Sequence, residues 1–582
     1  MVGGVLMDKK KKVKRQNITE LILLLVLVAL VNLVGSFLFH RFDLTREKRY
    51  TISDGTKSTL RELNDVVYIK VYLDGPMPAG FRRLKKAVKE TLDEFRAYSK
   101  SNIEYVFINP SESPDPKTRR EIYDQLAQDG LKFFNVQSAD RTGATITQVV
   151  FPAAILSYRQ HGQDYERVVN FFSGSISNVF NDASINKAIE MLEYEFITGI
   201  RTVSRENTPK VAIIEGHGEL DQYRINSLAL ALGSFYTVER VAIDEKLAAL
   251  DSYQAIIIAD PTEKFSEKDK FIIDQYVMRG GKVLWMVDAV KVDMNQIAYE
   301  KETMGEINSI INIGDMLYSY GVRINSSLVQ DYQCAIIPVN VAPIESEKPD
   351  FQPAPFVFFP LVNGVNNHPI SRNINPVKLE FASPIDTVGE DSRVQKTILL
   401  ATSDHSRVVR PPIIVNTSIF AEKPDPARFP LRGMPVAVLL EGEFTSHYRN
   451  RLPPTMMNNE AFRVYEESGT PTRMIVISDG DVARNFVQVR DEQYFVSPLG
   501  YDNYTRTTFG NKDFLLNCVN YLLDDEGYMD VRSREVKVRL LDEARILSQR
   551  SFWKMFNLLL PVVLVLLFGI AYIVIRKRKY TR

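Results

Sequence analysis

Cysteine and net charge are what this 582-residue chain has least of. It contains two cysteines, Cys334 and Cys518, which are too few for a disulfide framework and lack the spacing of a metal site. Its 72 Lys and Arg residues balance 72 Asp and Glu residues, so no net field favours nucleic acid. The remaining composition is that of a globular protein, and the length suggests several domains.

The sequence motifs of several enzyme classes are also missing. No G-x-x-x-x-G-K-[ST] occurs, so the chain lacks a P-loop and is not expected to hydrolyse ATP. No G-x-S-x-G occurs, Cys334 lacks the flanking glycines of a nucleophile elbow, and Cys518 lies within an apolar helical pattern. We therefore predict a protein that is not an enzyme, with no catalytic residue, no cofactor and no metal.

Two long apolar runs are present, one near each end of the chain. Residues 18–39 and 553–575 are each long enough to cross a bilayer as a helix, which takes about 20 residues. Basic tails flank them, at residues 1–17 and 576–582, and the positive-inside rule places both tails in the cytoplasm. No small-residue cleavage site follows the first run, which favours an uncleaved anchor over a signal peptide. We therefore predict two membrane spans, with everything between them on the far side of the membrane.

The stretch from Lys210 to Val290 has the clearest pattern of secondary structure. Strand-like apolar runs lie within residues 210–219, 237–243, 253–261 and 281–288. Three of these runs are almost unbroken, which suits strands that are buried on both faces of a parallel sheet. A helix is predicted from Ser266, whose side chain can cap it, to the Gly280-Gly281 pair. We therefore predict one large α/β domain over residues 209–530. Further along it, residues 307–320 are predicted to be helical, and the Pro-rich segments 343–355 and 421–435 are predicted to be loops.

Residues 50–205, which precede this domain, alternate between strand-like and helical segments. Strands are expected within residues 65–73, 103–108, 131–136 and 148–158, and helices within residues 82–98, 121–128 and 185–201. This order resembles a thioredoxin-like α/β domain, but no Cys-x-x-Cys is present, so we expect a binding or spacing role. After the large domain, residues 531–552 form a juxtamembrane segment, and the alternation over residues 531–541 favours an edge strand.

Polar side chains gather where the predicted strands of the large domain end. They are Glu215, His217, Glu219, Asp260 and Asp288. Ligands bind outside the carboxyl ends of strands in open α/β sheets, so these are candidate ligand-binding residues. The alternative is structural, with Gly216 and Gly218 forming a tight turn and the carboxylates capping helices or facing water.

A further acidic pair follows a later predicted strand. Asp479 and Asp481 form a D-x-D and are also candidate ligand-binding residues, because two carboxylates could hold a divalent cation. The additional oxygen ligands of a calcium loop are absent from the surrounding sequence. This absence favours a strand-to-helix turn that is capped by aspartate.

The ordered set of motifs along the chain resembles the GldG family, gliding-motility-associated auxiliary proteins of ABC transporters in Bacteroidota. The motifs are DLTREKRYTIS at residues 43–53, EGHGE at 215–219, DQYVMRGGK at 274–282, EGEFTS at 441–446, PLGYD at 498–502 and GNKDFLLN at 510–517. The resemblance implies an inner-membrane complex with a GldF-like permease and a GldA-like ATPase, and a mainly periplasmic chain. It also implies that the large domain is similar to non-catalytic relatives of the amidotransferase fold.

Polar and small residues inside the two apolar runs are candidate contacts to the permease. They are Asn32, Gly35, Ser36, Asn557 and Gly569. Polar groups in hydrocarbon are costly unless they are partnered, and small residues allow close helix approach. The same features would equally allow the two spans to pair with each other.

Three interpretations of function are open. The first is a membrane-anchored accessory subunit of an ABC transporter associated with gliding motility and protein secretion. The second is a hydrolase or amidotransferase-like enzyme that uses the strand-end residues around His217. The third is a binding module for a peptide or sugar at the same edge. They differ in whether the strand-end residues converge on one cleft.

Overall fold

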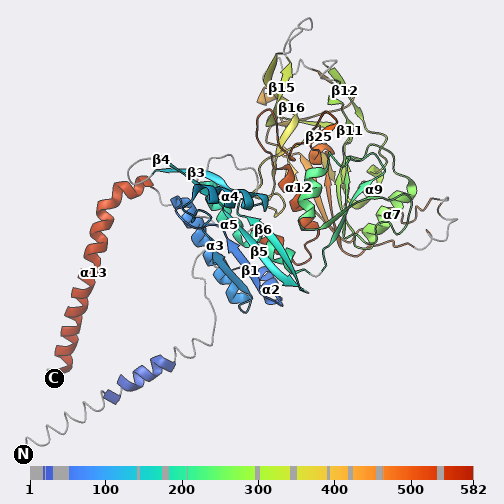
Figure 1. Cartoon of the computed structure of the whole chain (residues 1–582). Helices are drawn as coiled ribbons and strands as arrows, with labels where there is room; N and C mark the ends of the chain where they lie inside the picture. The colour runs from blue at the N-terminus through green and yellow to red at the C-terminus, as the bar shows by residue number, and fades with distance from the viewer. Residues whose placement is uncertain are drawn as a thin grey trace, which may run out of the picture. The chain divides into compact units, whose positions relative to one another are not determined.

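The computed structural model describes most of the chain. The described residues are 18–19, 21–30, 52–139, 145–160, 162–172, 182–205, 207–294, 296, 302–340, 350–389, 393–416, 424–453, 456, 462, 465–533 and 543–580. The chain divides into two compact units, residues 1–534 and residues 535–582 (Figure 1). The first unit contains two main sheets, and the second contains the long helix α13 (Glu543–Tyr580).

The N-terminal sheet has four strands in the order β2-β1-β5-β6. Its strands are β1 (Val67–Val71), β2 (Ile103–Phe107), β5 (Ala153–Gln160) and β6 (Gln163–Asn170). β1 is parallel to β2 and antiparallel to β5, and β5 is antiparallel to β6. The associated elements are α2 (Asp54–Arg61), α3 (Ala79–Tyr98), α4 (Pro116–Gln128), the β3–β4 hairpin (Phe134–Ala139 and Thr145–Val150) and α5 (Asp182–Ser204). Side chains of α3 and α5 pack on the sheet to form its core. The expected likeness to thioredoxin folds stays a prediction.

The large sheet has ten strands, nine of them in the order β15-β16-β19-β22-β23-β10-β9-β7-β8. Its strands are β7 (Lys210–Glu215), β8 (Thr237–Ala242), β9 (Ala255–Ala259), β10 (Lys282–Met286), β15 (Cys334–Asn340), β16 (Phe351–Gly364), β17 (Val377–Lys378), β19 (Val394–Ala401), β22 (Pro435–Gly442) and β23 (Thr472–Ile477). Strands β8, β7, β9, β10 and β23 are parallel, as predicted for the stretch from Lys210. Strands β22, β19, β16 and β15 continue the sheet antiparallel, so the fold is mixed α/β.

Strand β9 shows why its sequence is an unbroken apolar run. Ala255, Ile257 and Ala259 belong to the core on one face of the sheet, which also receives α6 (Asn226–Gly233) and α12 (Asn511–Leu522). Ile256 and Ile258 belong to the core on the opposite face, beneath α7 (Glu267–Met278) and α9 (Gly314–Tyr320). Successive side chains of a strand point to opposite faces, so a strand covered on both sides has no place for polar residues.

Two helices begin at a capping serine, and one of these serines is the predicted Ser266. The side chain of Ser266 accepts a hydrogen bond from the backbone N–H of Asp269 at 3.0 Å, at the start of α7. The side chain of Ser53 accepts one from Thr56 at 3.0 Å, at the start of α2. These bonds satisfy backbone donors that have no partner within the helix.

Two predictions for the large domain were wrong. Residues 307–320 are not one helix, because β12 (Glu302–Ile307) pairs with β21 (Ile413–Asn416) and only Gly314–Tyr320 is helical. The Pro-rich segment before residue 355 is not wholly a loop, because strand β16 begins at Phe351. The proline-bearing end of β16 pairs with β15 at the edge of the sheet, where missing N–H groups are tolerated.

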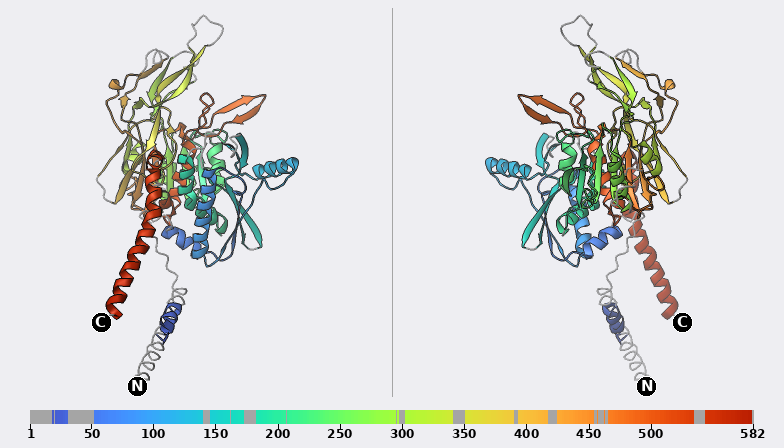
Figure 2. Two further views of the ribbon diagram at one scale, coloured as in Figure 1. Left: turned by 90° about the vertical axis from the view of Figure 1, so that its left-hand side faces the viewer. Right: turned by 90° about the vertical axis from the view of Figure 1, so that its right-hand side faces the viewer.

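The remaining elements are small sheets, a hairpin and short helices. They are β11 (Val290–Lys291), β13 (Val322–Ile324), β14 (Leu328–Asp331), β18 (Ile385–Thr387), β20 (Ser406–Val409), η2 (Pro426–Arg428), η3 (Asp481–Ala483), η4 (Tyr528–Ser533) and the β24–β25 hairpin (Val487–Arg490 and Gln493–Val496). The hairpin projects from the body of the molecule (orange, Figure 2). An edge strand was expected over residues 531–541, but residues 531–533 belong to the short helix η4. Residues 534–541 lie outside the described part.

Helix α13 contains the membrane-span candidate of the described chain. Its segment Ser548–Arg578 is long and apolar enough to cross a bilayer, and its most apolar part is not buried. The first predicted span includes a described apolar helix over Leu21–Leu30, whereas Asn32, Gly35 and Ser36 lie outside the described residues. The prediction of two spans therefore stays a prediction.

Candidate functional site

Three neighbouring strands of the large sheet each end in an aspartate. Asp260 follows β9, Asp288 follows β10 by two residues, and Asp479 follows β23 by two residues. The strands are parallel, so their carboxyl ends meet at one edge of the sheet. Asp481, two residues beyond Asp479, joins them. These four residues are named here the aspartate cluster, and their role as ligand-binding residues stays a prediction.

Backbone donors and one arginine hold the aspartate cluster together. Asp288 accepts a hydrogen bond from the N–H of Gly480 at 2.7 Å, and Asp479 accepts one from Asp481 at 2.7 Å. Arg484 lies 2.5 Å from Asp260 and 2.6 Å from Asp481. These contacts occupy carboxylate oxygens that a cation would need.

Burial gives the aspartate cluster a strong preference for protons. Desolvation raises the pKa of Asp288, and the nearby charges of Asp481, Asp479 and Asp260 raise it further. Desolvation also raises the pKa of Asp481 to about 7, although the Arg484 charge opposes the rise. The described residues contain no group of three or more His, Cys, Asp or Glu side chains arranged to hold a metal. The bond from Gly480 and the ion pairs of Arg484 make the aspartate cluster a link between strand ends.

His217 belongs to a separate group of buried polar residues. Its Nδ1 lies 3.2 Å from Glu219 and its Nε2 lies 3.2 Å from Asp269. The ring stacks on Phe265 with 3.9 Å between centroids, and the residue is 5% exposed. Burial alone would lower the pKa of His217, but the bonds to Asp269 and Glu219 outweigh it and raise the pKa to about 9. An imidazolium with both nitrogens engaged is poorly placed to act as a general base.

The turn that contains His217 holds neighbouring parts of the fold together. Gly216 and Gly218 have φ values of 111° and 75°, which is the left-handed region that favours glycine. The His217 carbonyl accepts hydrogen bonds from the N–H groups of Thr262 and Glu263 at 2.9 and 2.8 Å, fastening this turn to the end of β9. Glu215 instead forms an ion pair of 2.9 Å with Arg240. The structure therefore assigns Glu215, His217 and Glu219 to contacts within the fold.

Neither cysteine has the chemistry of a nucleophile. Burial raises the pKa of Cys518, which belongs to α12 and is fully enclosed in the core. Burial and the charge of Asp331 raise the pKa of Cys334 to about 12. Thiols with raised pKa values carry almost no thiolate at neutral pH, and the thiolate is the reactive form.

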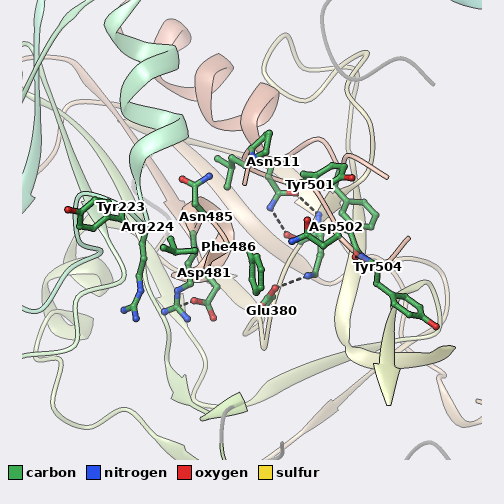
Figure 3. Close-up of a pocket in the computed structure, with 18 of the residues that line it drawn as sticks. Tyr223, Arg224, Glu380, Asp481, Asn485, Phe486, Tyr501, Asp502, Tyr504 and Asn511 are labelled. Atoms are coloured by element: carbon green, nitrogen blue, oxygen red, sulfur yellow. Dashed lines mark hydrogen bonds and ion pairs between the residues drawn. The ribbon is translucent and has the colours of Figure 1, made fainter. Parts of the chain in front are cut away.

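A cavity of about 660 Å³ opens beside the aspartate cluster. Of the residues predicted from strand ends, Asp481 lines it, together with its partner Arg484. Tyr223 and Arg224 lie at one end of the cavity, and Tyr501 and Tyr504 lie at the other (Figure 3).

The walls of this cavity combine aromatic rings with balanced charges. The Tyr223 ring stacks on Tyr494 of the β24–β25 hairpin, with 4.0 Å between centroids and 6° between planes. Phe486, Tyr501, Tyr504 and Phe509 add further rings. The charged lining residues are Asp221, Arg224, Lys378, Glu380, Asp481, Arg484 and Asp502. Four of these residues are carboxylates and three are cations, and Lys378 pairs with Glu380 at 2.8 Å, so the charges of the lining nearly balance.

Sequence reasoning missed most of this cavity. The hairpin that carries Tyr494 was not predicted, and Tyr223 lies far from it in sequence. Arg484 could have been predicted, because it follows the D-x-D by three residues and one helical turn brings such residues together.

Comparisons with known proteins cover nearly the whole chain. A family model described as an ABC-type uncharacterized transport system matches residues 208–518. A model for a domain of unknown function matches residues 46–157. An uncharacterized protein from Borreliella burgdorferi is 20% identical over 583 residues, which are 98% of this chain and 99% of that protein.

Solved structures give weaker likenesses. The mmIFT52 N-terminal domain matches with a TM-score of 0.30 and 14% identity, over 54% of this chain and 96% of that chain. A ThuA-like protein from Parabacteroides merdae matches with a TM-score of 0.25 and 12% identity, over 58% of this chain and 94% of that chain. Likenesses at these scores support no conclusion about fold or function.

Proposed function

This chain belongs to the auxiliary family of ABC-type uncharacterized transport systems, and on that premise we propose that it is a membrane-anchored accessory subunit of an ABC transporter. The observation that carries the proposal is the family match over residues 208–518, which takes in the sheet and the helices that cover it. The chain has no P-loop, so ATP hydrolysis is assigned to a separate ATPase and passage across the membrane to a separate permease.

Helix α13 supports the membrane anchor. Its side chains from Phe552 to Ile575 are largely exposed and almost all apolar. Leaving such a surface in water costs about 25 cal/mol for each Å², so a bilayer or membrane helices must cover it. The basic residues Arg576, Lys577 and Arg578 at its end favour a cytoplasmic C-terminus. With a first span over residues 18–39, both termini would be cytoplasmic in a bacterial inner membrane, and the bulk of the chain would be periplasmic.

The finer identity rests on the motifs that resemble the GldG family. They support a GldF-like permease and a GldA-like ATPase as partners, and a role in gliding motility and protein secretion. They also support a thioredoxin-like N-terminal domain that acts as a spacer and an amidotransferase-like large domain without catalysis.

The cavity of about 660 Å³ beside the aspartate cluster is called here the aromatic cavity. It favours a second role within the same complex, which is the binding of a peptide or sugar. Stacked rings such as Tyr223 and Tyr494 suit the apolar faces of sugars and peptide side chains. The balanced charges of the lining suit a ligand without strong net charge. A hydrolase centred on His217 has less support, because His217 is buried and both ring nitrogens are engaged.

Reconstitution tests the accessory role. The chain would be co-expressed with the ABC permease and ATPase encoded in its own genome, and the complex purified in detergent. We expect the three proteins to co-purify in a fixed ratio and the ATPase rate to change when this chain is omitted. A permease–ATPase pair that assembles and hydrolyses ATP identically with and without this chain would contradict the proposal.

A further inference from the structure

A second cavity, of about 250 Å³, lies between the elements around the N-terminal sheet and those around the large sheet. One side comes from β6 and α5 of the N-terminal region, and the other from α12 and η4. Direct contacts join the two sides, since Asn520 of α12 donates a hydrogen bond to the Tyr194 hydroxyl of α5 at 3.3 Å. The cavity is named here the basic cavity.

The basic cavity carries a clear excess of positive charge. Its cationic lining residues are Lys132, Arg167, Lys187, Lys512 and Arg532. Two carboxylates, Glu195 and Asp513, line it as well, which leaves an excess of three positive charges. This composition contrasts with the aromatic cavity, where cations and carboxylates nearly balance.

Three of the cations that line the basic cavity, Lys132, Lys187 and Arg167, have lowered pKa values. Desolvation lowers the pKa of Lys132, and the Lys512 ammonium lowers it further. Desolvation lowers the pKa of Lys187, with Arg532 adding repulsion that nearby carboxylates oppose. Desolvation also lowers the pKa of Arg167. A bound anion would relieve this repulsion.

Two buried polar atoms in the lining lack a hydrogen-bond partner among the described residues. They are Nε of Arg532 and Oγ1 of Thr198. The rest of the Arg532 guanidinium is fixed, because Nη1 donates to Asn517 at 2.9 Å and Nη2 donates to the Arg372 carbonyl at 3.3 Å. Arg532 is 9% exposed, so an unpartnered N–H there is costly.

We propose that the basic cavity binds the phosphate group of a small phosphate ester. Arginine and lysine are the side chains that recognise phosphate, the first through directed N–H bonds and the second as point charges. The unpartnered Arg532 Nε and Thr198 Oγ1 would bond to phosphate oxygens. Such a ligand would link α5 to α12 and η4. A lipid headgroup and a free phosphate ester share this chemistry, and both are tested.

Calorimetric titration of the full chain in detergent at low ionic strength tests the site. The probes are glycerol 3-phosphate, inorganic pyrophosphate and the soluble lipid dihexanoyl phosphatidylglycerol. We expect saturable binding of glycerol 3-phosphate or of the lipid, weakened about tenfold or more in the double variant Lys187→Met, Lys512→Met, whereas binding of pyrophosphate alone would contradict an ester ligand. Both lysines are exposed residues, so this variant should fold. Tighter binding of the lipid than of glycerol 3-phosphate would identify the natural ligand as a lipid headgroup. Tighter binding of glycerol 3-phosphate would identify it as a free phosphate ester.

Lys86→Met is the matched control, since Lys86 is an exposed lysine of α3 that does not line the cavity. Its affinity should equal that of the unmodified chain. The variant Lys187→Arg, Lys512→Arg keeps the charges and should retain binding. Failure of all three probes to bind, or equal binding by the Met double variant, would overturn the proposal.

Discussion

The Arg484 guanidinium lies 2.5 Å from the Asp260 carboxylate, so a cation from the turn after β23 neutralises the end of β9. Because Arg484 also lies 2.6 Å from Asp481, it is a shared counter-ion for aspartates of two different strand ends. The edge of the sheet where ligands bind in many α/β proteins is here occupied largely by internal contacts. The open part of the edge is the aromatic cavity beside it.

Replacement of Arg484 by Met should destabilise the protein. The change leaves Asp260 and Asp481 buried without their counter-ion, and removing one partner of a buried pair costs about 3–5 kcal/mol. Arg484 is 40% exposed on its side chain, so about 2–3 kcal/mol is expected. Urea unfolding of the full chain in detergent at pH 7, followed by fluorescence of the buried Trp285, measures the loss.

The pH dependence separates this cause from a general packing defect. The pKa values of Asp260 and Asp481 are higher in the folded protein than in the unfolded chain. As pH falls, these two carboxylates therefore take up protons in the folded protein and lose the negative charge that Arg484 balances. The deficit of Arg484→Met should therefore shrink between pH 7 and pH 5. Arg490→Met, in an exposed strand of the hairpin, is the control and should change little. A deficit that is constant with pH would argue against the charge explanation.

Replacement of Gly480 by Ala should disturb Asp260 through a steric contact. A Cβ at this position would lie 2.6 Å from Asp260 Oδ1 and 2.7 Å from its Cβ, well inside van der Waals contact. Overpacking of this kind costs about 1–3 kcal/mol. The measurement is the midpoint of urea unfolding, compared with Gly233→Ala, where the described part of the chain places no atom outside the helix's own backbone within 4 Å of the new Cβ. Equal midpoints for the two variants would show that the turn can shift to relieve the contact.

His217→Gln should lose stability only where the imidazolium is charged. The folded pKa is raised to about 9 from an unfolded value near 6.5, so the contribution is full below pH 6.5 and is lost as pH rises to about 9. Allowing for solvent screening, the loss should be about 2 kcal/mol at pH 6 and small at pH 9.5. Unfolding free energies at the two pH values measure it.

His368→Gln provides a control of opposite sign. Desolvation lowers the pKa of His368 to about 4, so its neutral form is the folded one and protons destabilise the fold below pH 6.5. This variant should gain relative stability as pH falls toward 5. If both histidine variants showed the same pH dependence, the assigned charge states would be incorrect.

Sequence reasoning succeeded where one local rule decided the structure. The run at Ala255–Ala259 needed only the rule that strands covered on both faces are apolar, and Ser266 needed only its capping geometry. It failed at Phe351–Gly364, because whether a proline-bearing segment becomes a strand depends on its place at the sheet edge. That place is a property of the whole fold.

The candidate functional site also has parts that the sequence could predict and parts that it could not. Asp260 and Asp288 follow strands whose parallel arrangement the apolar runs predicted, whereas the parallel arrangement of the strand before Asp479 was not predicted. The Tyr223–Tyr494 stack could not be predicted, because it joins a loop after β7 to a hairpin over 270 residues later. Long-range pairs of this kind leave no local pattern in the sequence.

The last prediction concerns Asn557 and Gly569 of α13, the candidate permease contacts within the described residues. A polar side chain in hydrocarbon gains roughly 0.6–2 kcal/mol from an interhelical hydrogen bond, and a glycine lets another helix approach closely. Among the described residues, and apart from the helix's own backbone, no atom lies within 4 Å of a Cβ built on Gly569. We therefore expect Asn557→Leu with Gly569→Leu to reduce recovery of the permease with this chain. Val565→Leu, at a well-exposed apolar position of the same helix, should not. The measurement is the permease-to-chain ratio after purification in mild detergent, with membrane insertion checked separately. An unchanged ratio for the double variant would mean that α13 only anchors the chain, and that the transporter is held by the region outside the membrane.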